Sequence, residues 1–237
     1  MKDIIYVVNT NDGEAPDWLN YTLGSIQQYS RKVDAQLDTI QDESLYHINY
    51  PLSFFKTKRS YYSLLKIHCL QKFITSEYNN CLILDRDIYI QDDAVNVFTY
   101  GKYSNPGMYS RVCRCKPLIA KTRDILDRTN TSRPKGPINR NSGMIYIDRP
   151  TAVQLCKHLP ADGQWDAYVK GLKIEDLVTI GGDQPIINYA RIKAKIPFRS
   201  LSKSHNVNWK RRTQSNDQFI HYPGYSGKES LLESVSG

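Results

Sequence analysis

One short segment constrains the fold of this chain more than any other. Four consecutive apolar residues at positions 81–84 (CLIL) are followed at once by Asp85 and Asp87. A continuous apolar run of this length is typical of a strand that is buried on both faces of a parallel sheet. Open α/β sheets bind ligands just beyond the carboxyl ends of their strands. The segment therefore predicts a buried strand that delivers two carboxylates to a functional edge.

Strands and helices alternate along the rest of the chain. Apolar runs predict further strands at Ile4–Val8, Ser142–Ile147 and Gln218–Tyr222. Apolar residues at helical spacing predict helices that begin near Pro16-Asp17 and that cover Lys58–Thr75 and Gln184–Ile192. This order favours an α/β fold with helices on both faces of a mostly parallel sheet. Residues 104–137 contain four prolines and are predicted to leave the sheet, and we expect residues 1–237 to form a single domain.

The composition is that of a soluble globular protein. The chain has 237 residues, 40% of them hydrophobic, and a formal charge of +8, with a mean hydropathy of −0.54. No apolar run approaches the ~20 residues that a membrane-spanning helix needs, and the apolar run at the N-terminus is too short for a signal peptide. Five cysteines fit neither a disulfide framework nor a zinc motif, so we expect a cytoplasmic protein. The positive charge requires an anionic partner: nucleic acid, an acidic membrane surface or a phosphorylated small molecule.

Three residues are candidate metal ligands. Side chains two positions apart on an extended chain point the same way, so Asp85 and Asp87 could face one hard cation such as Mn²⁺ or Mg²⁺. The same D-x-D pattern also arises wherever a strand simply meets solvent. His221 closes a predicted strand and could supply a neutral imidazole ligand, or it could be structural.

Polar residues at three other places could contact a ligand. Asn141 and Ser142 precede a glycine at the mouth of a predicted strand, where a turn would equally explain them. Asp183 fits the N-cap of a helix, but capping does not explain the adjacent Gln184. Two glycines and Lys228 follow His221 and could wrap an anionic group.

In their order and spacing these motifs resemble glycosyltransferase family 8, the group that includes glycogenin and bacterial lipopolysaccharide galactosyltransferases. The resemblance spans nearly the whole chain. The six matching elements are Val8-Asn-Thr-Asn-Asp, Ser63-Leu-Leu-Lys-Ile-His-Cys, Leu84-Asp-Arg-Asp, Asn141-Ser-Gly, Gly182-Asp-Gln with Asn188, and His221 with Gly224 and Lys228. The resemblance implies a single GT-A-type domain with a Rossmann-like sheet. Its nucleotide-binding half would cover about residues 1–100, and its donor-sugar and acceptor half about residues 101–237.

The resemblance also implies an activity: metal-dependent transfer of a hexose or pentose from a nucleotide-diphosphate sugar, expected to be a UDP-sugar, with retention of anomeric configuration. The acceptor would be a glycan, a glycolipid or a glycoprotein. The implied ligands of Mn²⁺ or Mg²⁺ are Asp85, Asp87 and His221, and Asp183 and Gln184 take the catalytic role beside the anomeric carbon. The implied donor-binding residues are Val8, Thr10, Asn11, Lys66, Asp85, Arg86, Asn141, Ser142, Gly224 and Lys228.

Acceptor recognition is predicted in two basic stretches, Arg111–Arg140 and Asn206–Arg212. They suit an acidic glycan, a lipid-linked diphosphate or plain solvation, so peripheral membrane contact stays open. Tyr109, Trp165 and Trp209 are candidates for stacking on sugar rings, with ordinary packing as the alternative.

Two rival classes make distinct demands on the sequence. A sugar-phosphate nucleotidyltransferase needs a glycine-rich, basic loop after its first strand, whereas residues 9–15 (NTNDGEA) are acidic. A nucleic-acid-binding module needs basic and aromatic residues interleaved on one platform, whereas the basic residues here are scattered, so we expect no nucleic-acid partner.

Overall fold

The computed structural model describes residues 2–9, 16–40, 58–99, 107–161, 163–174, 183–202, 204–211, 217–223 and 225–236. Its strands are β1 (Asp3–Val8), β2 (Ala35–Ile40), β3 (Asn80–Asp85), β4 (Ile88–Ile90), β5 (Met108–Ser110), β6 (Met144–Asp148), β7 (Phe198–Ser200), β8 (Val207–Asn208) and β9 (Phe219–His221). Its α-helices are α1 (Asp17–Lys32), α2 (Lys58–Thr75), α4 (Lys116–Arg128), α5 (Arg149–Cys156), α6 (Trp165–Leu172), α7 (Asp183–Lys193) and α8 (Tyr225–Ser236). Short 3₁₀ turns cover Val97–Thr99 and Trp209–Arg211.

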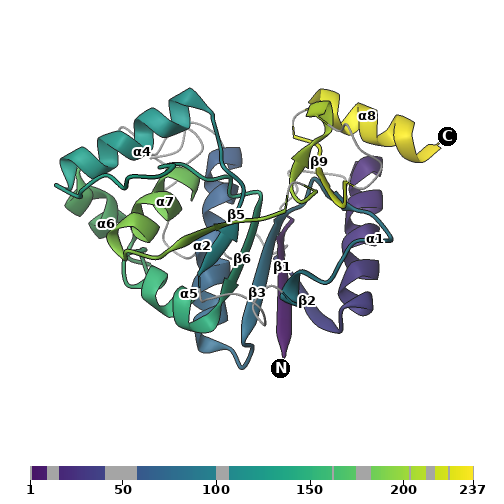
Figure 1. The fold of residues 1–237 in the computed structure, drawn as a ribbon, viewed down its shortest axis with the longest axis horizontal. Coiled ribbons are helices and arrows are strands. Elements are labelled where there is room, and N and C mark those ends of the chain that lie inside the picture. The colour runs from purple at the N-terminus through teal and green to yellow at the C-terminus, as the bar shows by residue number, and fades with distance from the viewer. Residues whose placement is uncertain are drawn as a thin grey trace.

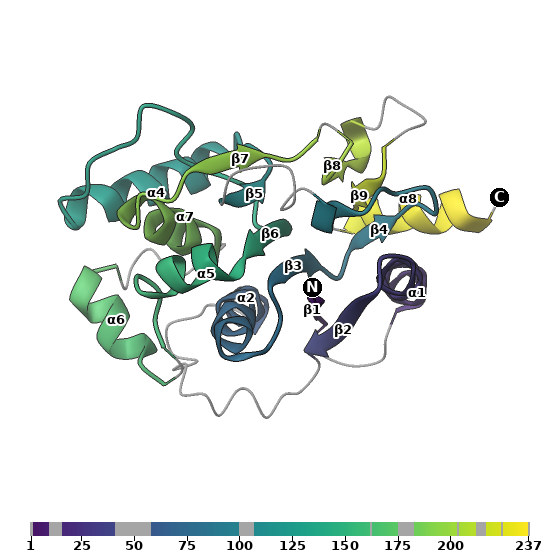
Figure 2. The same ribbon diagram turned by 60° about the horizontal axis from the view of Figure 1, so that its bottom comes forward.

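A six-stranded sheet in the order β2-β1-β3-β6-β5-β7 forms the centre of the molecule (Figure 1). Its pairs are parallel except at β6, which runs antiparallel to both of its neighbours. The predicted α/β class with a mostly parallel sheet is therefore confirmed. A second sheet of three short strands, β4-β9-β8, lies with α8 beside α1, away from α4, α6 and α7 (Figure 2).

The apolar strands of the central sheet are buried on both faces because helices cover each face. Alternate residues of β1 enter different clusters: Ile4 and Tyr6 pack in one, Ile5 and Val7 in the other. The first cluster also contains residues of α2, α4, α5, α6 and α7, and the second contains residues of α1, β4 and β9. Double burial explains why β1 and β3 read as continuous apolar runs.

The prediction that residues 104–137 leave the sheet was wrong for Met108–Ser110. This segment contains β5, which pairs with β6 and β7 inside the sheet, and the helix α4. Pro117 lies in the first turn of α4, where a missing N–H costs nothing and a fixed φ favours the helix. A proline in this segment can therefore indicate the start of a helix as well as irregular structure. The strand β5 has only three residues, which is too short to show periodicity in the sequence. In the part of the chain that the structure describes, no helix is long and apolar enough to cross a membrane.

The side chain of Asp148 ties the end of β6 to the start of α5, and this supports a stability prediction. Its Oδ1 accepts a hydrogen bond of 2.9 Å from the backbone N–H of Thr151, and its Oδ2 accepts one of 3.2 Å from Gly107. Asp148→Ala should lower the free energy of unfolding by about 1–2 kcal/mol, because it removes the helix cap. Asp148→Ser, which keeps a capping oxygen, should recover most of the loss in urea denaturation. Equal losses in both variants would contradict a capping role.

Candidate functional site

Two carboxylates lie at the carboxyl end of β3, as the sequence predicts. Asp85 is the last residue of β3, opposite Val8 of β1, and its backbone N–H donates a 2.8 Å hydrogen bond to the carbonyl of Gly143. Asp87 lies in the turn that leads into β4, and its carbonyl accepts a 2.9 Å bond from the N–H of Tyr222. The backbone of both residues is therefore fixed by segments distant in the sequence.

The imidazole of His221 completes an acidic cluster. His221 ends β9 opposite Ile88 of β4, and its Nε2 lies 3.0 Å from Asp87 Oδ1 and 3.7 Å from Asp85 Oδ2. One ligand atom from each of the three residues lies within 4.8 Å of the other two. Carboxylate oxygens with one imidazole nitrogen are a donor set that suits Mn²⁺ and related divalent ions. The residues that the sequence nominated as metal ligands thus fit that role.

Electrostatics inside this cluster reflect burial and close charges. Burial alone would lower the pKa of His221, but the Asp87 carboxylate raises it above the ordinary value. Burial would raise the pKa of Asp87, yet the facing imidazolium holds it below its usual range. Burial raises the pKa of Asp85. The imidazolium form of His221 and the carboxylate form of Asp87 therefore stabilise each other.

Gly143 is a structural requirement of this cluster. A Cβ at this position would lie 2.8 Å from Asn141 Oδ1, 2.8 Å from His221 Cε1 and 2.9 Å from Asp85 Oδ2. These distances are too short for carbon, so any side chain here would displace the candidate ligands. The glycine of the Asn-Ser-Gly motif is explained by this close approach.

Lys66 lies behind the carboxylates and is almost fully buried, with 4% of its surface exposed. Its Nζ forms an ion pair with Asp85, lies 3.4 Å from Asp183 Oδ2, and donates a 3.2 Å hydrogen bond to the carbonyl of Ser142. Burial by itself would lower the pKa of Lys66, but Asp183 and Asp85 raise it above the usual value, so the amine stays charged. One ammonium therefore connects α2, β3 and α7.

The amides around Ser142 form a connected network. Asn141 Oδ1 accepts hydrogen bonds from the N–H of Gly143 at 2.7 Å and from Asn206 Nδ2 at 2.8 Å. Gln184 Oε1 accepts the N–H of Ser142 at 3.3 Å, which leaves Gln184 Nε2 buried and without a hydrogen-bond partner among the described residues. A buried donor without a partner is costly. A ligand hydroxyl group at this place would satisfy it.

Asn188 of α7 holds this network from behind. Its Oδ1 accepts the N–H of Arg140 at 3.0 Å, and its Nδ2 donates to Asn139 Oδ1, the Arg140 carbonyl and the Gln184 carbonyl at 3.1, 3.0 and 2.7 Å. The Asn that follows Gly-Asp-Gln in the motif is therefore a positioning residue for both the Asn-Ser-Gly segment and α7.

Two cations meet on one aromatic ring beside the acidic cluster. The Arg86 guanidinium carbon lies 5.6 Å from the centre of the Trp18 ring, and Lys228 Nζ lies 4.4 Å from it. The charge of Lys228 also contributes to the lowered pKa of Asp87. Arg86 and Lys228, which are far apart in the sequence, are thus brought to the same side of the cluster by α1 and α8.

The structure gathers most of the predicted site residues at one edge of the sheet. Those brought together are Val8, Lys66, Asp85, Arg86, Asp87, Asn141, Ser142, Asp183, Gln184, His221 and Lys228. Thr10, Asn11 and Gly224 lie outside the described residues. Tyr109 and Trp165, proposed to stack on sugars, are instead core residues with 4% and 0% of their surface exposed. Trp209 is partly buried and packs against the cluster of Trp18, Ile220 and Tyr222.

Three residues of this region were not identified from the sequence. The ring of Trp18 forms cation–π contacts with Arg86 and Lys228, but the apolar spacing of α1 predicts only a core position for it. Asn206, with a positive φ of 53°, was named only as the start of the basic stretch Asn206–Arg212, and no motif signals that it orients Asn141. Asn9 directly follows β1, with its Oδ1 buried and without a partner in the described part of the chain, and the Val-Asn-Thr-Asn segment was the signal that could have identified it.

Solved structures of glycosyltransferases share this architecture. A glycosyltransferase involved in the glycosylation of the major capsid of PBCV-1 is 12% identical, with a TM-score of 0.60 over 98% of this chain and 100% of that chain. Mouse xyloside xylosyltransferase 1 is 13% identical, with a TM-score of 0.56 over 93% of this chain and 97% of that one. The galactosyltransferase LgtC, in complex with donor and acceptor sugar analogues, is 13% identical, with a TM-score of 0.56 over 99% and 95%.

These likenesses define the class of fold. No protein-family model and no curated protein matches the sequence. The chain has the fold of GT-A glycosyltransferases, and its structural neighbours agree with the resemblance to family 8.

Gly143 provides a direct test of the cluster geometry. Gly143→Ala should abolish the stabilisation of the protein by Mn²⁺, because the added Cβ would displace Asp85 and His221. The matched control is Gly24→Ala in α1, where a Cβ would meet nothing within 4 Å. That variant should keep the Mn²⁺ response and gain up to about 1 kcal/mol of stability. Thermal unfolding with and without Mn²⁺ measures both. An unchanged Mn²⁺ response in Gly143→Ala would show that the ion binds elsewhere.

The buried ammonium makes a second prediction. Lys66→Met should lower the free energy of unfolding by about 3–5 kcal/mol at neutral pH, because Asp183 would remain buried, and Asp85 half-buried, without the ammonium between them. The deficit should shrink as the pH falls, since burial raises the pKa of Asp85 and its protonated carboxyl group needs no counter-charge. Lys72→Met on the same helix removes the exposed 2.7 Å ion pair with Asp38 and should cost less than about 1 kcal/mol. Similar losses in the two variants would contradict a central role for Lys66.

Proposed function

We propose that this protein is a metal-dependent glycosyltransferase that uses a nucleotide-diphosphate sugar as donor. The observation that carries the proposal is the convergence of Asp85, Asp87 and His221 at the carboxyl edge of a GT-A sheet, with their ligand atoms within 4.8 Å of one another. The neighbours add support, since LgtC was crystallised with donor and acceptor sugar analogues and the mouse protein is a xylosyltransferase.

The residues of the cluster would hold a divalent cation, Mn²⁺ or Mg²⁺. When bound, such an ion stabilises the negative charge that develops on a departing diphosphate. Arg86 and Lys228 lie beside the cluster on Trp18 and would add positive charge toward the same phosphates. Lys66 is buried and does not face solvent. Its ammonium favours the ionised form of Asp85 and holds that side chain in place.

The amide network would hold the donor sugar. Gln184 offers a buried Nε2 that no described residue uses, and Asn141 and Ser142 border it through the contacts given above. Asp183 is held beside Lys66 at the start of α7, close to where the reacting carbon would lie. We infer a UDP-sugar donor of the hexose or pentose type, a hydroxyl acceptor on a glycan, glycolipid or glycoprotein, and retention of anomeric configuration.

The test is stabilisation by nucleotide sugars in the presence of metal. Thermal unfolding should be screened against UDP- and GDP-sugars with and without Mn²⁺; a ligand at 100 times its Kd should stabilise the protein by about 2.7 kcal/mol. Slow hydrolysis of the same donor should follow the same metal dependence.

A matched pair of variants locates the effect. Asp85→Asn/Asp87→Asn should lose the metal-dependent shift and at least about a hundredfold of donor hydrolysis, because metal and phosphate stabilisation are removed together. Asp92→Asn/Asp93→Asn makes the same change of charge at exposed positions just after β4 and should behave as the wild type. Full turnover in the first double variant would overturn the proposal, as would turnover of a nucleoside triphosphate with a sugar phosphate in place of a nucleotide sugar.

A further inference from the structure

Basic residues are scattered along the whole chain, but almost all of their excess over acidic residues lies in one segment. Residues 111–140 contain nine Lys and Arg against two Asp, so they contribute seven of the eight excess charges. The remaining residues of the chain are close to neutral. Arg140 is buried, and the other eight cations are at least partly exposed. This concentration, in about an eighth of the sequence, marks a surface suited to an anionic partner rather than to general solubility.

This segment begins at the candidate active site. The carbonyl of Arg111 accepts a 2.8 Å hydrogen bond from the N–H of Asn141, and Arg111 Nη1 donates one of 3.1 Å to the carbonyl of Asn206, whose side chain contacts Asn141. Val112 and Arg140 form an antiparallel bridge directly beside these contacts. The start of the basic segment is thus attached to the residues that border Gln184.

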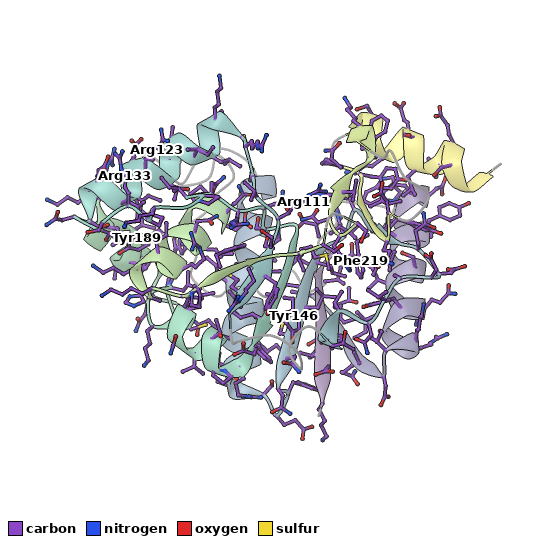
Figure 3. The ribbon with its side chains drawn as sticks, in the orientation of Figure 1. Arg111, Arg123, Arg133, Tyr146, Tyr189 and Phe219 are labelled. Carbon is purple, nitrogen blue, oxygen red and sulfur yellow. The ribbon has the colours of Figure 1, made fainter. Side chains whose placement is uncertain are left out.

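From that point the segment leads outward along α4. Figure 3 shows Arg111 between the α4 and β9 sides of the molecule and Arg123 farther out on the α4 side. The buried residues of α4 are Thr122, Ile125 and Leu126, and this face packs against α7, the helix that begins with Asp183 and Gln184. The opposite face is turned to solvent. The basic surface and the active-site residues are therefore held by the same pair of helices.

Several cations on this surface have no partner within the described residues. The side chains of Arg114, Lys116 and Arg123 are exposed and form no hydrogen bond or ion pair there. Arg133 differs, because it pairs with Asp127 at 2.5 Å. We call Arg114, Lys116 and Arg123 the basic rim. An arginine without a partner favours carboxylate and phosphate groups, which its planar fork can bind in pairs.

Val112 is the one described large hydrophobic residue near the basic rim that is exposed, and the rim has none of the exposed Trp, Phe or Leu side chains that a membrane-binding helix inserts. Such helices alternate Lys and Arg with exposed Trp, Phe or Leu. The described large hydrophobic residues that are exposed are Tyr21, Val95, Val112 and Val153, and α4 contains none of them. Arginines without an apolar face fit a hydrated polyanion better than a lipid surface.

We propose that the basic rim binds an acidic glycan, one that carries carboxylate or phosphate groups, and leads it from α4 to the donor site as the acceptor. This inference rests on the proposed function, because it names the acceptor of the same transfer. Arg111 marks the end of the rim at which the acceptor hydroxyl would meet the donor sugar.

The test is binding of defined glycans at low and high salt. The probes are hexagalacturonate for carboxylates, phosphorylated maltodextrin for phosphates, neutral maltohexaose, and vesicles of phosphatidylglycerol with phosphatidylcholine. At least one acidic glycan should bind more tightly than maltohexaose, and its affinity should fall as NaCl rises, because counterions screen exposed charges within about 10 Å at 0.1 M.

Charge reversal separates this surface from net charge alone. Arg114→Glu/Arg123→Glu should weaken acidic-glycan binding by about tenfold or more, equivalent to ~1.4 kcal/mol. Arg31→Glu/Lys32→Glu makes the same change of net charge at exposed positions at the end of α1, on the opposite side of the molecule from α4 (Figure 1), and should leave binding within about twofold, since screening limits such distant charges. Circular dichroism confirms that each variant is folded.

Three results would overturn the inference: equal loss in the two double variants, no preference of the wild type for either acidic glycan over maltohexaose, or binding of anionic vesicles without binding of acidic glycans. The nucleotide-sugar shift of the wild-type protein is recorded in parallel. If the wild-type protein shows no shift with any nucleotide sugar but prefers an acidic glycan, the proposed function is contradicted. If it shows the shift but no preference for acidic glycans, only this inference is contradicted.

Discussion

The buried ammonium of Lys66 is the interaction on which the rest of the candidate site depends. Asp85 and Asp183 come from β3 and α7, and two carboxylates that close to each other in a low-dielectric environment would repel unless a cation lay between them. The same ammonium also binds the carbonyl of Ser142, and so it fixes the Asn-Ser-Gly segment. The single charge of Lys66 therefore positions β3, α7 and the Asn-Ser-Gly segment, which are far apart in the sequence.

This arrangement divides the carboxylates into two roles. Asp183 faces inward to Lys66, while Asp87 faces His221 and the side where Arg86 and Lys228 lie on Trp18. Asp85 contributes to both, with one oxygen on Lys66 and the other 3.7 Å from His221. The shared residue couples the acidic cluster to α7, so a shift of α7 would be felt directly at the candidate metal ligands.

The parts of the fold that the sequence predicts are those whose residues carry their own signal. β1 and β3 are buried on both faces and show as apolar runs, and α2 and α7 show helical spacing. β2 lies at the edge of the sheet with a polar sequence, AQLDTI, and β5 and β7 have three residues each, so no periodicity announces them. Their conformations are set by neighbouring strands, which only the tertiary structure supplies.

The candidate site follows the same logic. Asp85, Asp87 and His221 could be predicted as candidate metal ligands because carboxylate and imidazole groups are common ligands, and the motif spacing assigns all three to one site. Trp18 and Asn206 could not, because a tryptophan in an amphipathic helix and an asparagine in a loop have many ordinary roles. Their contribution is to orient residues that the motifs do name, which depends on packing and not on composition.

The distribution of charge completes the relation between fold and chemistry. The acidic cluster is enclosed by β3, β4 and β9, and each carboxylate there has a cationic neighbour, so it contributes little to the field outside. Seven of the eight excess positive charges lie instead in residues 111–140, beside the cluster. A nearly neutral molecule with one basic flank attracts an anionic polymer to that flank alone. The polymer would then reach the reaction centre from the side of α4 and α7, where Gln184 holds its unused amide, while the nucleotide would approach from the side of Trp18.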